Sequence, residues 1–174
     1  MSMRRKSGAS IADLPAVMWL LFVVILYPLI DLATVGMRYT FMVTTSREAA
    51  MAASRGKTFF ADSSASDLSA VHLASAMAAN AASRFTGITL TSVSTDLVVT
   101  NLNTNAVTRQ TTPLATQPDI DNFLYAYEVT VTGNVWPLLP FKGPVFSNIP
   151  GLTGPMTVSI TTQKMCENTQ GLNQ

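Results

Sequence analysis

Few side chains in this sequence could carry out chemistry. The chain holds one histidine, His72, and one cysteine, Cys166, whereas metal clusters and intrachain disulfides each need several such side chains. No Ser/His/acid order, no pair of catalytic carboxylates and no glycine-rich phosphate loop can be recognised. We therefore expect no enzyme, and no metal, cofactor or small-molecule substrate. His72 should be a surface or partly packed residue. Cys166 should be an unpaired bystander, with an intermolecular disulfide as the open alternative.

One spacing near the N-terminus does indicate chemistry, with the chain itself as the substrate. A short basic stretch that begins at Arg4 ends in Gly8, an acidic residue follows five positions later, and apolar residues come next. This order resembles the processing site of type IV pilin-like proteins, in which a membrane aspartyl peptidase cuts after the glycine. The resemblance implies cleavage after Gly8, so that residues 1–8 form a leader, Ala9 becomes the N-terminus and Asp13 becomes the fifth mature residue.

Asp13 has two interpretations, and they are compatible. Its carboxylate can neutralise the free α-amino group of a neighbouring subunit, because isolated charges are costly at the apolar end of a helix. It can also be the N-cap of the following helix, with Pro15 in the first turn, where a missing N–H costs nothing. A capping carboxylate can meet a second chain as well, so an assembly role and a capping role can hold together.

A run of seventeen uncharged and almost wholly apolar residues, 14–30, follows Asp13. This length is at the lower end of what a membrane-spanning helix needs, and the apolar residues occupy all sides of the helix. A buried core helix and a cleaved signal peptide are the alternatives, although the run is long for both. Pro28 should kink or locally melt the helix. We expect Asp31 at the surface near the outer interface, with a contact to a neighbouring helix as its alternative.

Composition and charge limit the remaining choices. The 174 residues are 48% apolar and 12% charged, which leaves room for one domain and an appendage. A net charge of +1 provides no broad positive field for nucleic acid. Residues 1–57 hold seven cations and three anions, and residues 58–174 hold four cations and seven anions. The basic residues before the apolar run predict a cytoplasmic N-terminus and an extracytoplasmic C-terminal part.

Beyond the apolar run the sequence predicts two helices. The helical pattern continues to Arg55, with Gly56 as its stop, so one helix of roughly 40 residues would start in the membrane and leave it. A second, alanine-rich helix should begin at Ser66 or Asp67 and end near Arg84.

From residue 88 the apolar period changes to two, which predicts strands. The clearest strands cover 125–131 and 156–160, and the weaker segments 88–90 and 97–99 are separated by a bulge or turn near Ser92. A turn at 101–105 should lead to another short strand. The prediction is a pilin-like α+β fold: a long transmembrane helix continuing into a small extracytoplasmic domain with a second helix and a 3–4-stranded antiparallel sheet. The second helix or the outer end of the first should cover the sheet. The predicted parts are a leader at 1–8, a helix at 9–56 and a domain at 57–174.

The connection between the last two strands, 136–155, is apolar and contains five prolines. Loops normally face water, so this one should pack back on the sheet, meet a partner or dip into the bilayer surface. Trp136, Phe141 and Phe146 are its candidate interface residues.

Together these motifs resemble the TadE-like family of minor pilins and pseudopilins from tight-adherence (Flp, type IVc) pilus systems. The similarity rests on the processing site, the apolar helix, the Arg-Glu-Ala-Ala segment at 47–50, the strand at 129–132, the Pro-Leu-Leu-Pro loop at 137–140 and the final strand at 157–160. It implies a structural component for assembling a pilus or related secretion machine, held in the bacterial inner membrane before incorporation. The implied partners are a prepilin peptidase, other pilin and pilus-assembly subunits, and membrane lipid. The alternative is an uncleaved single-pass envelope scaffold or receptor.

Overall fold

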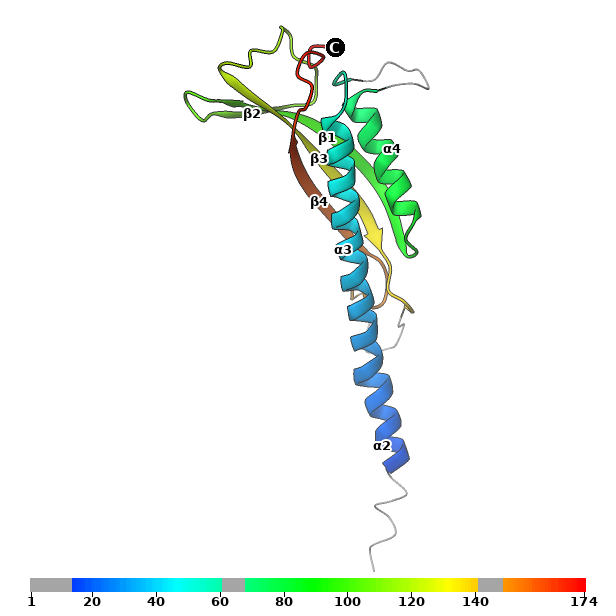
Figure 1. Cartoon of the computed structure of the whole chain (residues 1–174). Coiled ribbons are helices and arrows are strands. Elements are labelled where there is room, and N and C mark those ends of the chain that lie inside the picture. Colours follow the sequence, from blue (N-terminus) through cyan, green and yellow to red (C-terminus); the bar gives the residue numbers. More distant parts are fainter. Residues whose placement is uncertain (1–13, 61–67, 141–148) are drawn as a thin grey trace, which may run out of the picture.

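The computed structural model describes residues 14–60, 68–140 and 149–174. Its elements follow in the order α2 (Leu14–Leu21), η1 (Phe22–Leu26), α3 (Tyr27–Ser54), α4 (Ala70–Ser83), β1 (Ile88–Asn101), β2 (Val107–Gln110), β3 (Phe123–Val135) and β4 (Met156–Met165). The fold is therefore α+β, with a long N-terminal helix followed by a helix and an antiparallel sheet (Figure 1).

The predicted long helix is confirmed. Elements α2, η1 and α3 form one uninterrupted helix of 41 residues, from Leu14 to Ser54. Gly56 follows its end, and the N–H of this glycine donates to the carbonyl of Ala53 (2.9 Å). The N-terminal half of the helix projects away from the rest of the molecule, while its C-terminal half lies against the sheet (Figure 1).

The predicted start of the second helix is wrong by a few residues. Its N-cap is Ser69 rather than Ser66 or Asp67, and the Ser69 hydroxyl accepts a bond from the backbone N–H three residues later (3.2 Å). The reason lies outside the helix itself. The N–H of Lys57 donates to the carbonyl of Leu68 (2.9 Å), and this pairing between two chain segments holds residue 68 before the helix begins.

The four strands form one antiparallel sheet in the order β2-β1-β3-β4. Strand β3 alternates buried and partly exposed side chains from Tyr125 to Val135, as its sequence predicts. The two weaker segments belong to the single strand β1, because the break between them is a bulge between Leu90 and Ser92. The turn predicted at 101–105 is present and leads to β2.

Both helices cover the apolar face of the sheet, where the sequence left a choice between them. Helix α3 lies against β3 and β4, and α4 lies against β1 (Figure 1). Where the helices meet each other and the sheet, the buried side chains are mostly small, which allows close approach of the backbones. They include Ala49, Ala50, Ala53, Ala70, Ala74 and Ala78. Larger side chains fill the sheet face, where the rings of Phe59 and Tyr127 stack with centroids 6.0 Å apart.

The other face of the sheet is polar. Hydroxyl pairs link neighbouring strands, Thr130 with Thr161 (2.9 Å) and Thr132 with Ser159 (3.0 Å). A salt bridge joins Arg109 of β2 to Glu128 of β3 across β1 (2.9 Å). This part of the chain is thus one helical layer on one sheet, with serine and threonine supplying polarity where ions are few.

Candidate membrane and interaction surfaces

The N-terminal half of the long helix exposes its large apolar side chains. Every residue from Leu14 to Leu26 is exposed, and only 6% of the helix's most apolar 18-residue window is buried. A core helix of a water-soluble domain would be mostly buried, so this finding argues against that alternative. The helix is long and apolar enough to cross a membrane once, and it is the candidate for a single-pass span.

Pro28 is accommodated by a widened turn. The ring removes the N–H that would bond to the carbonyl of Val24, and a regular helix would bring the two into a clash. The preceding residues, Phe22–Leu26, adopt a π-helical turn, in which the N–H of Tyr27 donates to the carbonyl of Phe22. The local disturbance expected from the proline is therefore a π-bulge, and the helix continues through it.

Asp31 corrects one expectation. Its side chain is only 2% exposed, so it is not a surface carboxylate. Its Oδ1 accepts hydrogen bonds from the backbone N–H groups of Leu138 (2.9 Å) and Leu139 (3.1 Å), which lie in the connection after β3. Its Oδ2 is buried and has no hydrogen-bond partner among the described residues. We call these two hydrogen bonds from backbone amides to Asp31 the Asp31 latch, because they join the long helix to the β3–β4 connection.

Further contacts hold the same connection against the helix. The Arg38 guanidinium donates to the carbonyl of Trp136, and the N–H of Trp136 donates to the carbonyl of Gly87 (2.9 Å). On the other side of the connection, Gly151 lies against the buried side chain of Val35. The β3–β4 connection is therefore fixed to α3 near the point where the sheet ends and the exposed part of the helix begins (Figure 1).

The side chains of this connection point outward although its backbone is fixed. Trp136, Leu138, Leu139 and Ile149 are 43%, 51%, 52% and 42% exposed, whereas Pro137 is buried. We refer to these four exposed residues as the apolar tip. Self-packing of the loop, one of the three alternatives from the sequence, therefore does not account for these four side chains.

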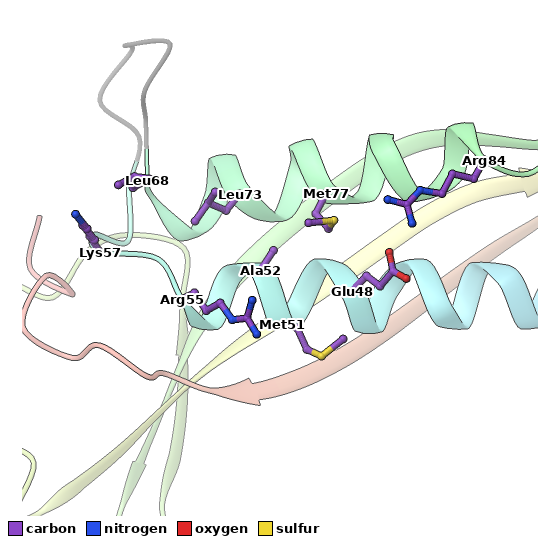
Figure 2. Close-up of a pocket in the computed structure, with 9 residues that line it drawn as sticks. All are labelled: Glu48, Met51, Ala52, Arg55, Lys57, Leu68, Leu73, Met77 and Arg84. Atoms are coloured by element: carbon purple, nitrogen blue, oxygen red, sulfur yellow. The ribbon is translucent and has the colours of Figure 1, made fainter.

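A second surface is a groove between α3 and α4 on the side away from the sheet. It encloses about 600 Å³. Met51, Leu73 and Met77 provide its apolar lining, and Figure 2 shows the leucine and methionine of α4 directed toward α3. Among the described residues, the cationic side chains of Arg55, Lys57 and Arg84 and the acidic side chain of Glu48 also line it.

The chain matches no known family or structure in three comparisons. No protein-family model, no curated protein and no solved structure is similar to it. A proposal about function must therefore rest on the surfaces described above and on the sequence motifs.

The sequence-predicted site residues are only partly within the structure. Gly8, Ala9, Asp13, Phe141 and Phe146 lie outside the described residues. Trp136 is described and lies in the apolar tip. Sequence reasoning missed the Asp31 latch and the contact of Arg38 with the loop. The sequence did contain a signal for the Asp31 latch, namely a carboxylate at the edge of an apolar run. A carboxylate that is shielded from water there needs a hydrogen-bond partner.

The single histidine and the single cysteine are not among the described residues that line the groove or form the apolar tip. His72 is exposed on α4, in agreement with its predicted position. Cys166 follows β4 and is partly buried, and burial raises the pKa of its thiol to about 12. Such a thiol is a poor nucleophile at neutral pH, which favours the bystander interpretation. Within the described residues, no three side chains of His, Cys, Asp or Glu gather in a way that could hold a metal ion.

Proposed function

We propose that this chain is a minor pilin or pseudopilin, a structural subunit in the assembly of a tight-adherence pilus or a related secretion machine. Its long helix would anchor it in the bacterial inner membrane with the N-terminus cytoplasmic, and the sheet with α4 would stand on the outer side. Cell adhesion would then be a property of the assembled pilus to which the subunit contributes.

The observation that carries this proposal is the continuity of one helix through two environments. Large apolar side chains are exposed from Leu14 to Leu26, while the same helix buries small side chains against β3 and β4 farther along. The Ser46 hydroxyl bonds to that of Thr162 (2.7 Å), and the carbonyl of Ser54 accepts from the N–H of Glu167 (2.9 Å). A helix joined so closely to its domain would transmit its position in a helical bundle directly to the sheet. This is what a subunit that assembles through its N-terminal helix requires.

The processing motif provides the first test. The full chain, expressed in a bacterial inner membrane together with a prepilin peptidase, should lose residues 1–8 and begin at Ala9. Intact-mass measurement on protein extracted from the membrane gives the answer directly. A variant Gly8→Leu, whose bulky side chain blocks the cleavage position, serves as the uncleaved reference. Retention of residues 1–8 in the parent chain would reject the pilin proposal and leave the uncleaved envelope scaffold or receptor.

Asp13 provides the second test. Asp13→Ala should insert into the membrane normally but fail to enter pili, because the neighbouring α-amino group loses its countercharge. Asp13→Glu retains the charge and should assemble. Sheared pili and membranes are compared by immunoblot, with the membrane fraction as the control for insertion. Normal incorporation of the alanine variant would remove the charge-pairing argument.

A further inference from the structure

We propose that the apolar tip inserts into the outer edge of the lipid bilayer, and that the Asp31 latch fixes it at that depth. The occupant of this surface is then lipid, at the boundary between acyl chains and headgroups. The inference rests on the membrane-spanning part of the proposed function and is independent of leader cleavage and pilus incorporation.

The length of the helix places Asp31 close to the outer boundary. An α-helix rises about 1.5 Å per residue, so a hydrocarbon core of about 30 Å takes about 20 residues. The first residue after the charged Asp13 is Leu14, and a span counted from there ends at Ala33. Asp31 precedes that position by two residues, or about 3 Å of helix. Tilt of the helix would place Asp31 deeper still.

The latch then sets the depth of the tip. Leu138 and Leu139 donate their N–H groups directly to Asp31 Oδ1 at 2.9 and 3.1 Å, so their backbone lies at the level of that carboxylate. Nearby on the helix, Leu29 and Leu32 are 60% and 64% exposed. The exposed side chains of the tip therefore lie at the same level along the helix as exposed apolar side chains of the span.

Several backbone groups at the two described ends of the connection, 136–140 and 149–155, have partners within the protein, and such internal partners are needed where irregular chain lies at membrane depth. The Trp136 N–H and carbonyl, and the amides of Leu138 and Leu139, all have protein partners. In the turn that precedes β4, the N–H of Ile149 donates to Thr153 Oγ1 (2.9 Å). Its carbonyl accepts from the N–H groups of residues 152 and 153 (3.1 and 2.9 Å).

The side chains fit the same environment. Leucine and isoleucine gain free energy on leaving water, and tryptophan is enriched at the membrane interface, where an apolar ring and a polar N–H are both accommodated. Arg38 lies about 10 Å beyond Asp31 along the helix, at headgroup level, and its guanidinium reaches the Trp136 carbonyl. The latch compensates part of the cost of a carboxylate at this depth: Asp31 is shielded from lipid and its Oδ1 is bonded to two backbone amides, while its Oδ2 has no partner among the described residues.

The test uses the two tryptophans of the chain, Trp19 and Trp136. The full-length variant Trp19→Phe leaves Trp136 as the reporter, and Trp136→Phe leaves Trp19. Each is reconstituted into phosphatidylcholine vesicles that carry a spin-label quencher either near the headgroup end of the acyl chain or near its terminal methyl. We expect blue-shifted emission from Trp136 and stronger quenching by the headgroup-end label than by the methyl-end label, with protection from aqueous acrylamide.

Three outcomes would contradict the proposal in distinguishable ways. Quenching of Trp136 by acrylamide and by neither lipid label would place the tip in water. Protection from acrylamide and from both labels would place the tip against protein, as the partner alternative requires. If Trp19 too is unaffected by the lipid labels, the membrane anchor itself fails, and with it the proposed function.

A matched pair of variants separates insertion from folding. In the Trp19→Phe background, Leu138→Ser and Leu139→Ser together change two side chains that are about half exposed, so the fold should be retained. They should shift the emission of Trp136 to longer wavelength and weaken its quenching by the headgroup-end label. The same change at Leu102 and Val107, which are also about half exposed but lie at the far end of the sheet, should leave the quenching unchanged. Equal quenching in both pairs would overturn the assignment.

Discussion

The Asp31 latch makes a prediction that can be worked out in energy. In the parent protein the backbone amides of Leu138 and Leu139 make short hydrogen bonds to Asp31 that are largely shielded from water. In Asp31→Ala both amides lose this acceptor. A hydrogen bond to a charged group contributes about 1.5–3 kcal/mol, and a stranded buried donor costs about as much. Loss of two such bonds should favour opening of the β3–β4 connection by about 3 kcal/mol or more. Because 1.4 kcal/mol corresponds to about a factor of ten, the open form should become at least about a hundredfold more populated.

Hydrogen exchange followed by mass spectrometry on the full chain in lipid nanodiscs measures this change. Peptides that contain residues 136–140 should exchange faster in Asp31→Ala than in the parent chain. The increase should be at least about two orders of magnitude, because opening of the connection is favoured by about 3 kcal/mol or more. Peptides from the middle of β3, around Val129, should be unaffected because this part of the strand is paired with β1 and β4 and makes no bond to the latch. Asp31→Asn is the matched control, since its amide oxygen can occupy the acceptor position without the charge, and residues 136–140 should exchange more slowly in it than in Asp31→Ala. Unchanged exchange at 136–140 in the alanine variant would refute the latch.

Three more predictions concern the sheet and its helices. Gly56→Ala should lower the free energy of unfolding by about 1–3 kcal/mol, because the added Cβ would lie 2.7 Å from the first backbone nitrogen of α4. Gly36→Ala, with nothing within 4 Å, is the control, and equal thermal midpoints would refute the argument. The Arg109 hydrogen bond holds the pKa of Glu128 below its usual range, so its contribution is present at neutral pH and lost as the pH falls through that lowered pKa. Glu128→Gln should thus have a slightly lower thermal midpoint than the parent at neutral pH and the same midpoint in strong acid; a pH-independent difference would refute the linkage. Native Cys166 should react with iodoacetamide at mildly alkaline pH more slowly than the unfolded chain, by about one to two orders of magnitude, because burial raises its pKa to about 12 and leaves little thiolate; comparable rates would show that burial does not protect it.

The apolar periodicity of the sequence predicted those helices and strands that keep the same face buried along their whole length. In β3 the side chains alternate between the helical layer and the polar face over its length, so a period of two in the sequence identifies both the strand and its buried side. The long helix was equally legible, because its helical pattern continues to Gly56 and Pro28 was expected only to disturb it locally. Strand β1 was harder, since the bulge between Leu90 and Ser92 shifts the phase of the pattern within a single strand.

Sequence reasoning failed where a distant segment decides the outcome. Ser66, Asp67 and Ser69 are all acceptable N-caps, and the choice among them depends on the pairing of Lys57 with Leu68. Asp31 presents the same difficulty over a longer separation. Its partners lie more than a hundred residues away, and they are backbone amides, which carry no mark in the sequence. The outward direction of the tip side chains follows from those bonds and could not be predicted without them.

The long helix exposes its large apolar side chains and buries its small ones, the opposite of what is usual in a water-soluble protein. This pattern supports the proposal that the helix spans a membrane. Its largest side chains, such as Trp19 and Phe22, are 71% and 48% exposed, whereas small residues such as Ala49 and Ala53 are fully buried. In water, exposure of so many large apolar side chains over a continuous surface would oppose folding as a monomer. In a bilayer, lipid provides the apolar surroundings, and close packing of the helix on the sheet then depends on small side chains instead. The change from large exposed residues to small buried ones takes place between Asp31 and Met42, the same stretch to which the β3–β4 connection is fixed. The boundary that we propose between lipid and protein surroundings therefore coincides with two features, the change in size of the helix residues and the position of the latch.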